Sequence, residues 1–224
     1  MFIKICGITT EEDALLSIGM GADALGFNFV PGSVRQIRPS VARDIVKRLP
    51  GGIMTVGVFR NELRDRVIEV THEAGLQAAQ LHGHESADDS AWIAERVPMM
   101  IKAFVAGDPS MDRLIEYGAA AVLVDAPEPG SGNVFDWTLL DGRDRGRPLI
   151  LAGGLNPLNV GKAIESVQPW GVDVASGVEV IAGRKDPVLV REFITNARQA
   201  AADIEPDESE LAIDSMPYDW RNEQ

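Results

Sequence analysis

The sequence predicts an α/β fold with a parallel sheet, because short apolar runs alternate with segments of helical periodicity along most of the chain. Eight strand-like runs can be marked, and eight is the number of parallel strands that closes into a (β/α)8 barrel. About 250 residues is typical of that fold, so about 200 residues would make a compact version. We therefore expect a single TIM barrel over residues 1–201, followed by an acidic C-terminal extension over residues 202–224.

The predicted strands are rich in apolar and β-branched residues and are bounded by turn-forming residues. They span residues 2–6, 23–29, 53–59, 77–82, 99–105, 120–125, 148–152 and 171–175. A doubly wound open sheet is the alternative architecture. No glycine fingerprint for a dinucleotide follows the first strand, which favours the barrel.

Helical spacing fills most of the gaps between these strands. Thr10 is the expected N-cap of the first helix, which has an acidic first turn, and Pro39 stands at the start of the second. The expected helices span residues 10–20, 39–49, 61–75, 86–97, 156–167 and 186–201. The segment 135–142 has the weakest helical pattern of those considered.

The composition is that of an ordinary globular protein, with 45% hydrophobic and 25% charged residues among 224. One cysteine cannot form an intramolecular disulfide, and Met1 leads directly into a strand rather than into a secretory signal. No apolar run approaches the roughly 18 residues that span a bilayer. We therefore expect a cytoplasmic protein with no membrane partner.

The net charge of −13 argues against nucleic acid as a partner, since phosphate backbones require a positive patch. Much of this charge lies after residue 201, where eight acidic residues stand against Arg221 alone: Asp203, Glu205, Asp207, Glu208, Glu210, Asp214, Asp219 and Glu223. The body of the protein is therefore only mildly acidic, and an anionic substrate is not excluded. We expect the extension to be solvated, or else docked through its few apolar residues. Monomer and homodimer both stay open.

The active site of such a barrel lies at the C-terminal ends of its strands. Side chains alternate along a strand, so Lys4 and Cys6 share one face of the first strand, and Gln80 and His82 share one face of the fourth. Asp125 ends the sixth strand. We expect Cys6, His82 and Asp125 to converge at one mouth of the barrel, because each falls at the last position of its strand.

Each of these residues also has a purely structural interpretation. A cysteine in a strand is often a small buried hydrophobe, a histidine before glycine can hydrogen-bond a loop, and a strand-final aspartate often fastens a turn. An apolar barrel lining would not use Lys4, Gln80 and Asp125 for packing, however. Their coincidence on inward faces favours a site.

Small residues follow the seventh and eighth predicted strands. Gly153 and Gly154 lead from the seventh strand into a helix, and Ser176 and Gly177 follow the eighth. Glycines also make ordinary turns, but barrels often hold phosphate between these two loops, where backbone N–H groups approach an anion closely. The two loops together predict a phosphate site.

Several motifs occur in an order that resembles one family. They are "KICGIT" at 4–9, "EDAL" at 12–15, "GADALGFNF" at 21–29, "VGVF" at 56–59, "QLHGHE" at 80–85, "FDW" at 135–137, "LAGGLNPLNV" at 151–160, "VDVASGVE" at 172–179 and "KD" at 185–186. Together they cover nearly all of residues 1–200 and resemble phosphoribosylanthranilate isomerase, an enzyme of tryptophan biosynthesis. One departure is Pro129, which replaces the first glycine of a segment usual before "FDW".

The resemblance implies an Amadori rearrangement of N-(5-phosphoribosyl)anthranilate, an aminoaldose, to the corresponding 1-deoxyribulose 5-phosphate. It implies Cys6 as general base, Asp125 as general acid and Arg35 as the contact of the anthranilate carboxylate. His82 and Lys4 are further candidates for substrate binding, and Lys4 would favour the thiolate form of the cysteine. The reaction is acid–base chemistry with no redox step, so we expect neither a metal nor another cofactor.

The sequence leaves several other functions to be considered. A related ribose-phosphate isomerase of histidine biosynthesis, or a barrel acting on both substrates, would have an aspartate as base where this chain has Cys6. Indoleglycerol phosphate synthase would require its own lysine and glutamate residues. A non-catalytic barrel that binds a sugar phosphate would not need Cys6, Asp125 and Arg35 together.

Overall fold

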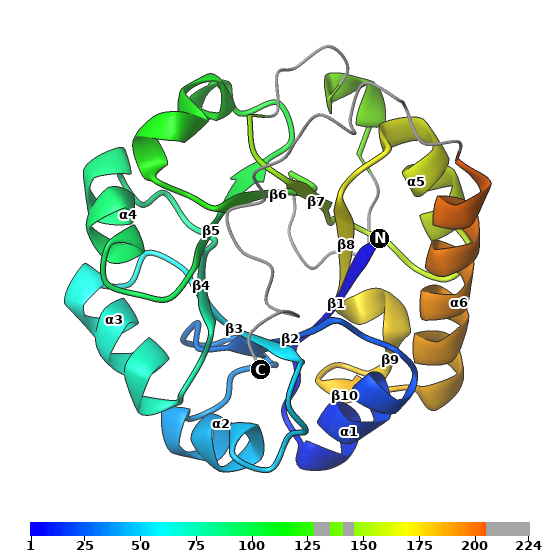
Figure 1. The fold of residues 1–224 in the computed structure, drawn as a ribbon, viewed down its shortest axis with the longest axis horizontal. Helices are drawn as coiled ribbons and strands as arrows, with labels where there is room; N and C mark the ends of the chain where they lie inside the picture. The colour runs from blue at the N-terminus through cyan, green and yellow to red at the C-terminus, as the bar shows by residue number, and fades with distance from the viewer. Residues whose placement is uncertain (128–134, 141–145, 205–224) are drawn as a thin grey trace.

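The computed structural model describes residues 1–127, 135–140 and 146–204. Eight strands pair side by side in sequence order and close into a barrel through the pairing of β1 with β8 (Figure 1). Every neighbouring pair in the barrel is parallel, and the helices form a ring around the strands. The predicted α/β class and the TIM barrel are confirmed.

The observed strands lie within the predicted ones and are at most one residue shorter at either end. They are β1 Phe2–Cys6, β2 Ala24–Asn28, β3 Met54–Phe59, β4 Ala78–Leu81, β5 Met100–Val105, β6 Ala121–Asp125, β7 Leu149–Leu151 and β8 Gly171–Val174. Cys6 and Asp125 end their strands as predicted, whereas His82 lies one residue beyond β4. The backbone N–H of His82 still donates to the carbonyl of Phe59 on β3, so the chain at His82 continues in the direction of β4.

The predicted helices are present; they are shorter than predicted, except that the last one runs two residues beyond its predicted end at residue 201. They are α1 Glu11–Gly19, α2 Pro39–Val46, α3 Arg64–Glu73, α4 Ala87–Ala94, α5 Val160–Val167 and α6 Pro187–Asp203. Thr10 caps α1 as expected, since its side chain accepts a hydrogen bond from the N–H of Asp13. Two connections are instead 3₁₀ segments: η1 Pro109–Tyr117, where no helix was predicted, and η2 Trp137–Leu140, within the weakest helical pattern.

The alternation of side chains along the strands divides the core into two layers. Phe2, Met54, Ile101 and other inward residues fill the barrel, while Ile3 and similar residues pack between strands and helices. Gly171 of β8 leaves room for this filling, because a Cβ there would lie 2.8 Å from the ring of Phe2. The inward residues nearer the C-terminal ends of the strands are polar, and they form the site.

A small antiparallel hairpin after β8 was not predicted. It follows η3 (Ser176–Val178) and consists of β9 Glu179–Ile181 and β10 Arg184–Lys185. Figure 1 shows it beside α1, outside the barrel. The backbone N–H of Lys185 donates to the Asp13 carboxylate at 3.2 Å, so the hairpin is fastened to α1.

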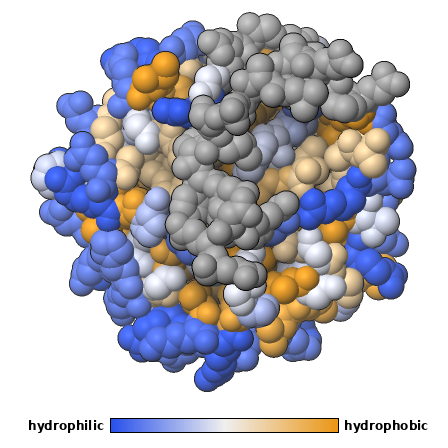
Figure 2. Space-filling model, viewed as in Figure 1, coloured by the Kyte–Doolittle hydropathy of each residue, from blue (hydrophilic) through white to orange (hydrophobic). Residues whose placement is uncertain are grey.

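Seen in the same direction, the outer edge of the molecule is mostly hydrophilic (Figure 2). Within the described ranges no helix is both long and apolar enough to cross a membrane. The expected acidic extension falls almost wholly on residues 205–224, and the departure at Pro129 falls on residues 128–134; both lie outside the described residues.

Candidate active site

A pocket of about 440 Å³ opens at the C-terminal ends of the barrel strands. Cys6, His82 and Asp125 all line it, together with Arg35 from the loop between β2 and α2. The structure therefore brings these four predicted residues to one cavity. The remaining predicted residues lie around it, with Lys4 buried beneath its floor and the glycine loops after β7 and β8 at its side.

Lys4 lies fully buried inside the barrel and is paired with an acidic residue of the neighbouring strand. Its Nζ donates to Asp173 Oδ1 at 2.9 Å, and the two residues stand opposite each other in the β1–β8 register. Although burial opposes it, the Asp173 carboxylate raises the pKa of Lys4 above its ordinary value, and the nearby Cys6 adds to this. Lys4 therefore stays a cation at neutral pH.

Cys6 shares this space because β2 carries a glycine beside it. A Cβ at Gly26 would lie 2.6 Å from Cys6 Sγ and 3.1 Å from Lys4 Nζ, so any side chain there would displace both groups. Burial raises the pKa of the Cys6 thiol above its ordinary value, while the charges of Lys4 and Lys185 lower it and Asp173 raises it. The free thiol is therefore mostly protonated at neutral pH, and the two cations limit how far burial suppresses the thiolate.

Asp125 and His82 meet on the far side of the pocket. His82 Nε2 lies 3.1 Å from Asp125 Oδ2, and Asp125 Oδ1 accepts a hydrogen bond from the N–H of Ala126 at 2.7 Å. The amide nitrogen of Gln80, buried below, lies 2.9 Å from His82 Nδ1. An amide N–H can only donate, so Nδ1 accepts, and a neutral His82 carries its proton on Nε2, facing Asp125.

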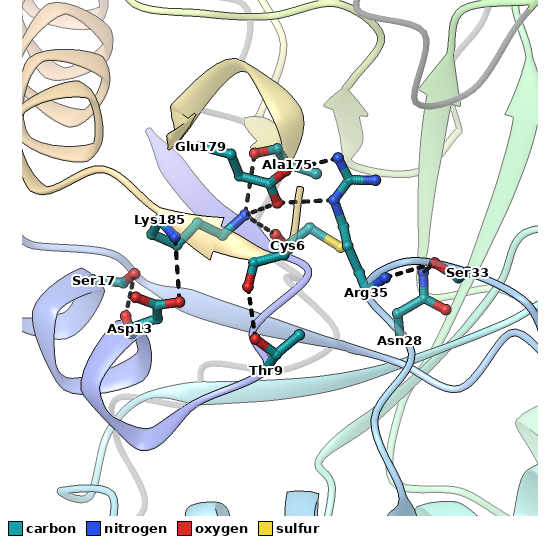
Figure 3. Close-up of polar contacts among 11 residues, drawn as sticks. Cys6, Thr9, Asp13, Ser17, Asn28, Ser33, Arg35, Ala175, Glu179 and Lys185 are labelled. Atoms are coloured by element: carbon teal, nitrogen blue, oxygen red, sulfur yellow. Dashed lines mark hydrogen bonds and ion pairs between the residues drawn. The ribbon is translucent and has the colours of Figure 1, made fainter. Parts of the chain in front are cut away.

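Arg35 lies across the end of β1. Its Nε and Nη2 donate to the two carboxylate oxygens of Glu179, each at 2.8 Å, in a bidentate pair (Figure 3). Gly7 makes this path possible, because it has φ of 79° and a Cβ there would lie 2.5 Å from Arg35 Cδ. Although burial opposes it, Arg35 and Lys185 hold the pKa of Glu179 below its ordinary value.

Lys185 is the centre of the contacts in Figure 3. Its buried Nζ donates to Glu179 Oε1 at 2.9 Å, to the carbonyl of Ala175 at 3.1 Å and to the carbonyl of Cys6. One lysine of the hairpin thus joins the end of β1, the residue after β8 and the carboxylate that holds Arg35. A buried ammonium without such partners would be costly.

The loop that follows His82 is fixed by a second buried ion pair. Lys102 of β5 reaches Glu85 at 2.7 Å and the carbonyl of Gly83 at 2.8 Å, and both side chains of the pair are almost fully buried. Glu85 also accepts from the N–H of Asn61 at 2.8 Å. Although burial opposes it, the Lys102 ammonium holds the pKa of Glu85 below its ordinary value. The motif "QLHGHE" therefore combines a pocket residue with the anchor of its loop.

The loops after β7 and β8 are in close contact. Gly153 and Gly154 have φ of 87° and 66°, and a Cβ at Gly177 would lie 1.9 Å from the carbonyl oxygen of Leu155. The Gly154 carbonyl accepts from the side-chain amide of Asn159 at 2.9 Å. In the described part of the chain, the N–H groups of Gly153 and Gly154 donate to no acceptor. These donors are available to an anion.

Three residues of the polar contacts around Cys6 and Arg35 were missed by reasoning from the sequence. Asp173 could have been found, because the alternation that places Lys4 inward also places Asp173 inward on the eighth strand. Glu179 and Lys185 stand on either side of a short segment that contains β-branched residues and Gly183, which has a positive φ. This pattern is typical of a hairpin. Their contacts with Arg35 and Cys6 join residues more than 140 positions apart, and no local pattern predicts that.

Comparisons with known proteins bear on this arrangement. Residues 3–196 match the family model described as N-(5'-phosphoribosyl)anthranilate (PRA) isomerase. The chain belongs to this family. It is 48% identical over 201 residues to the N-(5'-phosphoribosyl)anthranilate isomerase of Thermotoga neapolitana, with 88% of this chain and 98% of that protein covered.

Solved phosphoribosylanthranilate isomerases share the fold. The crystal structure from Thermotoga maritima superposes with a TM-score of 0.83 at 46% identity, covering 89% of this chain and 99% of that one. A phosphoribosylanthranilate isomerase in complex with reduced 1-(o-carboxyphenylamino)-1-deoxyribulose 5-phosphate gives a TM-score of 0.80 at 45% identity, with the same coverage. The predicted resemblance to this isomerase family is therefore confirmed over the whole barrel.

Proposed function

We propose that this chain isomerises N-(5'-phosphoribosyl)anthranilate in tryptophan biosynthesis, with Cys6 as general base and Asp125 as general acid. The observation that carries the assignment of roles is their placement: both side chains line one pocket, on β1 and β6, and each ends its strand. A substrate held between them presents one face to a thiol and the other to a carboxyl group.

The reaction begins with the opening of the ribose ring. Asp125 gives a proton to the ring oxygen, while the nitrogen lone pair forms a C1=N bond and the C1–O bond breaks. His82 Nε2, 3.1 Å from Asp125 Oδ2, faces the same carboxyl group and steadies it after the proton has left. Ring opening therefore takes place on the side of the pocket formed by β4 and β6.

The second step removes a proton from C2. The thiolate of Cys6 takes this proton, the electrons of the C–H bond form a C1=C2 bond, and the cationic nitrogen becomes neutral. The enolamine then takes a proton at C1 and loses one from its C2 hydroxyl, which gives the ketone. The nearby ammonium of Lys4 favours the thiolate, as the direction of its effect on the pKa of Cys6 indicates.

The two charged ends of the substrate are bound outside the reacting atoms. The N–H groups of Gly153 and Gly154, which donate to no acceptor among the described residues, supply donors for the phosphate, with the Ser176–Gly177 loop beside them. Arg35 binds the anthranilate carboxylate through the edge of its guanidinium that Glu179 does not occupy. The complex of a related isomerase with a reduced product supports a ligand of this class.

The proposal also includes the compartment, the oligomeric state and the domain division of this protein. The single cysteine favours a reducing cytoplasm as the compartment. A homodimer is favoured over a monomer by a relative from Thermotoga maritima that is described as dimeric. The barrel is taken as one catalytic domain over residues 1–201, with an acidic extension after it.

A turnover assay tests the proposal. Phosphoribosylanthranilate made in situ from anthranilate and phosphoribosyl pyrophosphate loses its fluorescence when it is isomerised, so purified protein should abolish the signal with saturation kinetics. A protein that binds the substrate without consuming it would instead be a sugar-phosphate-binding barrel.

A further inference from the structure

Arg60 also lines the active-site pocket. The sequence motifs did not identify it as a site residue. It follows β3 directly, one residue beyond the "VGVF" segment. Val56 and Val58 point into the barrel, so Arg60 continues the inward-facing series of that strand. Its neighbour across the sheet is His82, whose N–H donates to Phe59 just before it. Arg60 thus belongs to the uppermost ring of the pocket, with Cys6, His82 and Asp125.

Arg60 differs from the other cations of the pocket in having no partner among the described residues. Arg35 is held by both oxygens of Glu179, and Lys4 below is held by Asp173. Asp173 balances the charge of Lys4, and the carboxylate of Glu179 lies between Arg35 and Lys185. The guanidinium of Arg60 has no carboxylate partner in the described lining, so it attracts the anionic end of a ligand.

The position of Arg60 indicates which anionic end it meets. Strand order places β3 four strands from β7 in a ring of eight, so Arg60 stands across the barrel from the Gly153–Gly154 loop. A substrate whose phosphate lies at the β7–β8 loops extends its other end towards β2 and β3. That end is the anthranilate ring with its carboxylate. The apolar side chains of Val30, Pro31 and Val58 line the pocket on this side.

We propose that Arg60 binds the anthranilate carboxylate and, with Arg35, determines the preference of the site for a carboxylated aromatic amine. This inference rests on the proposed function, since it assumes that the phosphate occupies the β7–β8 side. Arg35 offers only the guanidinium edge that Glu179 leaves free, whereas Arg60 offers all of its N–H donors. The carboxylate lies between the two arginines.

The test compares two ligands that differ only in the carboxylate. They are reduced 1-(o-carboxyphenylamino)-1-deoxyribulose 5-phosphate and the same compound made from aniline, each titrated calorimetrically into wild type and Arg60→Met. We expect the variant to bind the carboxylated ligand about tenfold or more weakly, as for the loss of a charged hydrogen bond, and the aniline compound within about twofold of wild type. Binding of the aniline compound also shows that the variant is folded.

Two further variants sharpen the result. Arg60→Lys keeps the charge without the planar fork and should recover part of the loss. Arg64→Met is the matched control, because Arg64 pairs with Asp89 and stacks on Trp92 away from the pocket, and it should bind both ligands as wild type does. An equal loss for both ligands, or no loss for either, would overturn the role of Arg60. Absent turnover by wild type would instead contradict the proposed function.

Discussion

The wall of the pocket that carries Cys6 and the wall that carries Asp125 are held in different ways. The base-side wall, formed by β1, β8, the β9–β10 hairpin and Arg35 of the loop after β2, contains two sets of ion pairs: Lys4 with Asp173, and Glu179 with both Arg35 and Lys185. The acid-side wall, formed by β3, β4 and β6, holds Asp125 by one backbone N–H and by the imidazole of His82.

The difference follows from what each wall has to do. In the proposed mechanism Cys6 becomes an anion in a buried place, which is costly unless cations stand beside it before the reaction starts. Asp125 gives up and recovers a proton in the same proposal, and a fixed cation beside it would favour its ionised form. The base-side wall therefore supplies charged groups next to Cys6, whereas the acid-side wall only holds Asp125 in position.

The largest expected effect comes from removing either reacting group. Cys6→Ala and Asp125→Ala should each lower kcat by about 10²- to 10⁴-fold, the contribution of a positioned base or acid. The fluorescence assay measures this, with Asp65→Ala on the exposed surface of α3 as a control expected to match wild type. Activity within a fewfold of wild type in either alanine variant would remove that residue from its role.

A smaller effect should come from changing the charge of the base-side wall. Burial raises the pKa of Cys6, so kcat/KM should rise with pH into the alkaline range as the thiolate fraction grows. Lys4→Met removes a cation that lowers this pKa and leaves the buried Asp173 carboxylate that raises it, so the rising limb should move to higher pH.

The double variant Lys4→Met/Asp173→Asn separates charge from packing. It removes both members of the pair, so the rising limb of the kcat/KM profile should return part of the way towards its pH in wild type. A limb that stays in place in Lys4→Met would show that the ion pair does not tune the thiol. Recovery of the limb without recovery of the rate would show that Lys4 also supports the shape of the site, in addition to its effect on the pKa of Cys6.

The smallest effect is expected on the acid-side wall. Gln80→Leu removes the donor to His82 Nδ1, so the neutral imidazole is no longer confined to the tautomer with its proton on Nε2. We expect kcat to fall only a fewfold, because Asp125 itself is untouched, and ¹⁵N shifts of His82 to show a mixture of tautomers. An unchanged tautomer in the variant would remove Gln80 from this role.

The fold could be predicted from the sequence because its signals are local. The alternation of apolar runs with helical segments predicted all eight barrel strands, and alternation within β1 predicted that Lys4 and Cys6 share the barrel interior. The segment after β5 was not predicted as a helix, and it differs from the other connections because η1 is a 3₁₀ segment whose backbone is non-helical at Arg113.

The site was predicted less completely, for a physical reason. Cys6 and Asp125 end their strands and His82 directly follows one, and topology alone brings such positions together. Glu179 and Lys185 act from a hairpin outside the barrel, and their partners are set by three-dimensional packing rather than by spacing. Arg60 directly follows β3, and alternation along that strand could have indicated its inward position, but an arginine after a strand is ordinarily a solvated residue.

We propose that the two walls act in different steps, Asp125 in ring opening and Cys6 in proton removal from C2. The most direct test is the primary isotope effect on kcat with substrate deuterated at C2, made in situ from deuterated phosphoribosyl pyrophosphate. Cys6→Ser, with a weaker base, should show a larger isotope effect than wild type, and Asp125→Asn, limited by ring opening, should show almost none. A large isotope effect in Asp125→Asn together with none in Cys6→Ser would contradict the account.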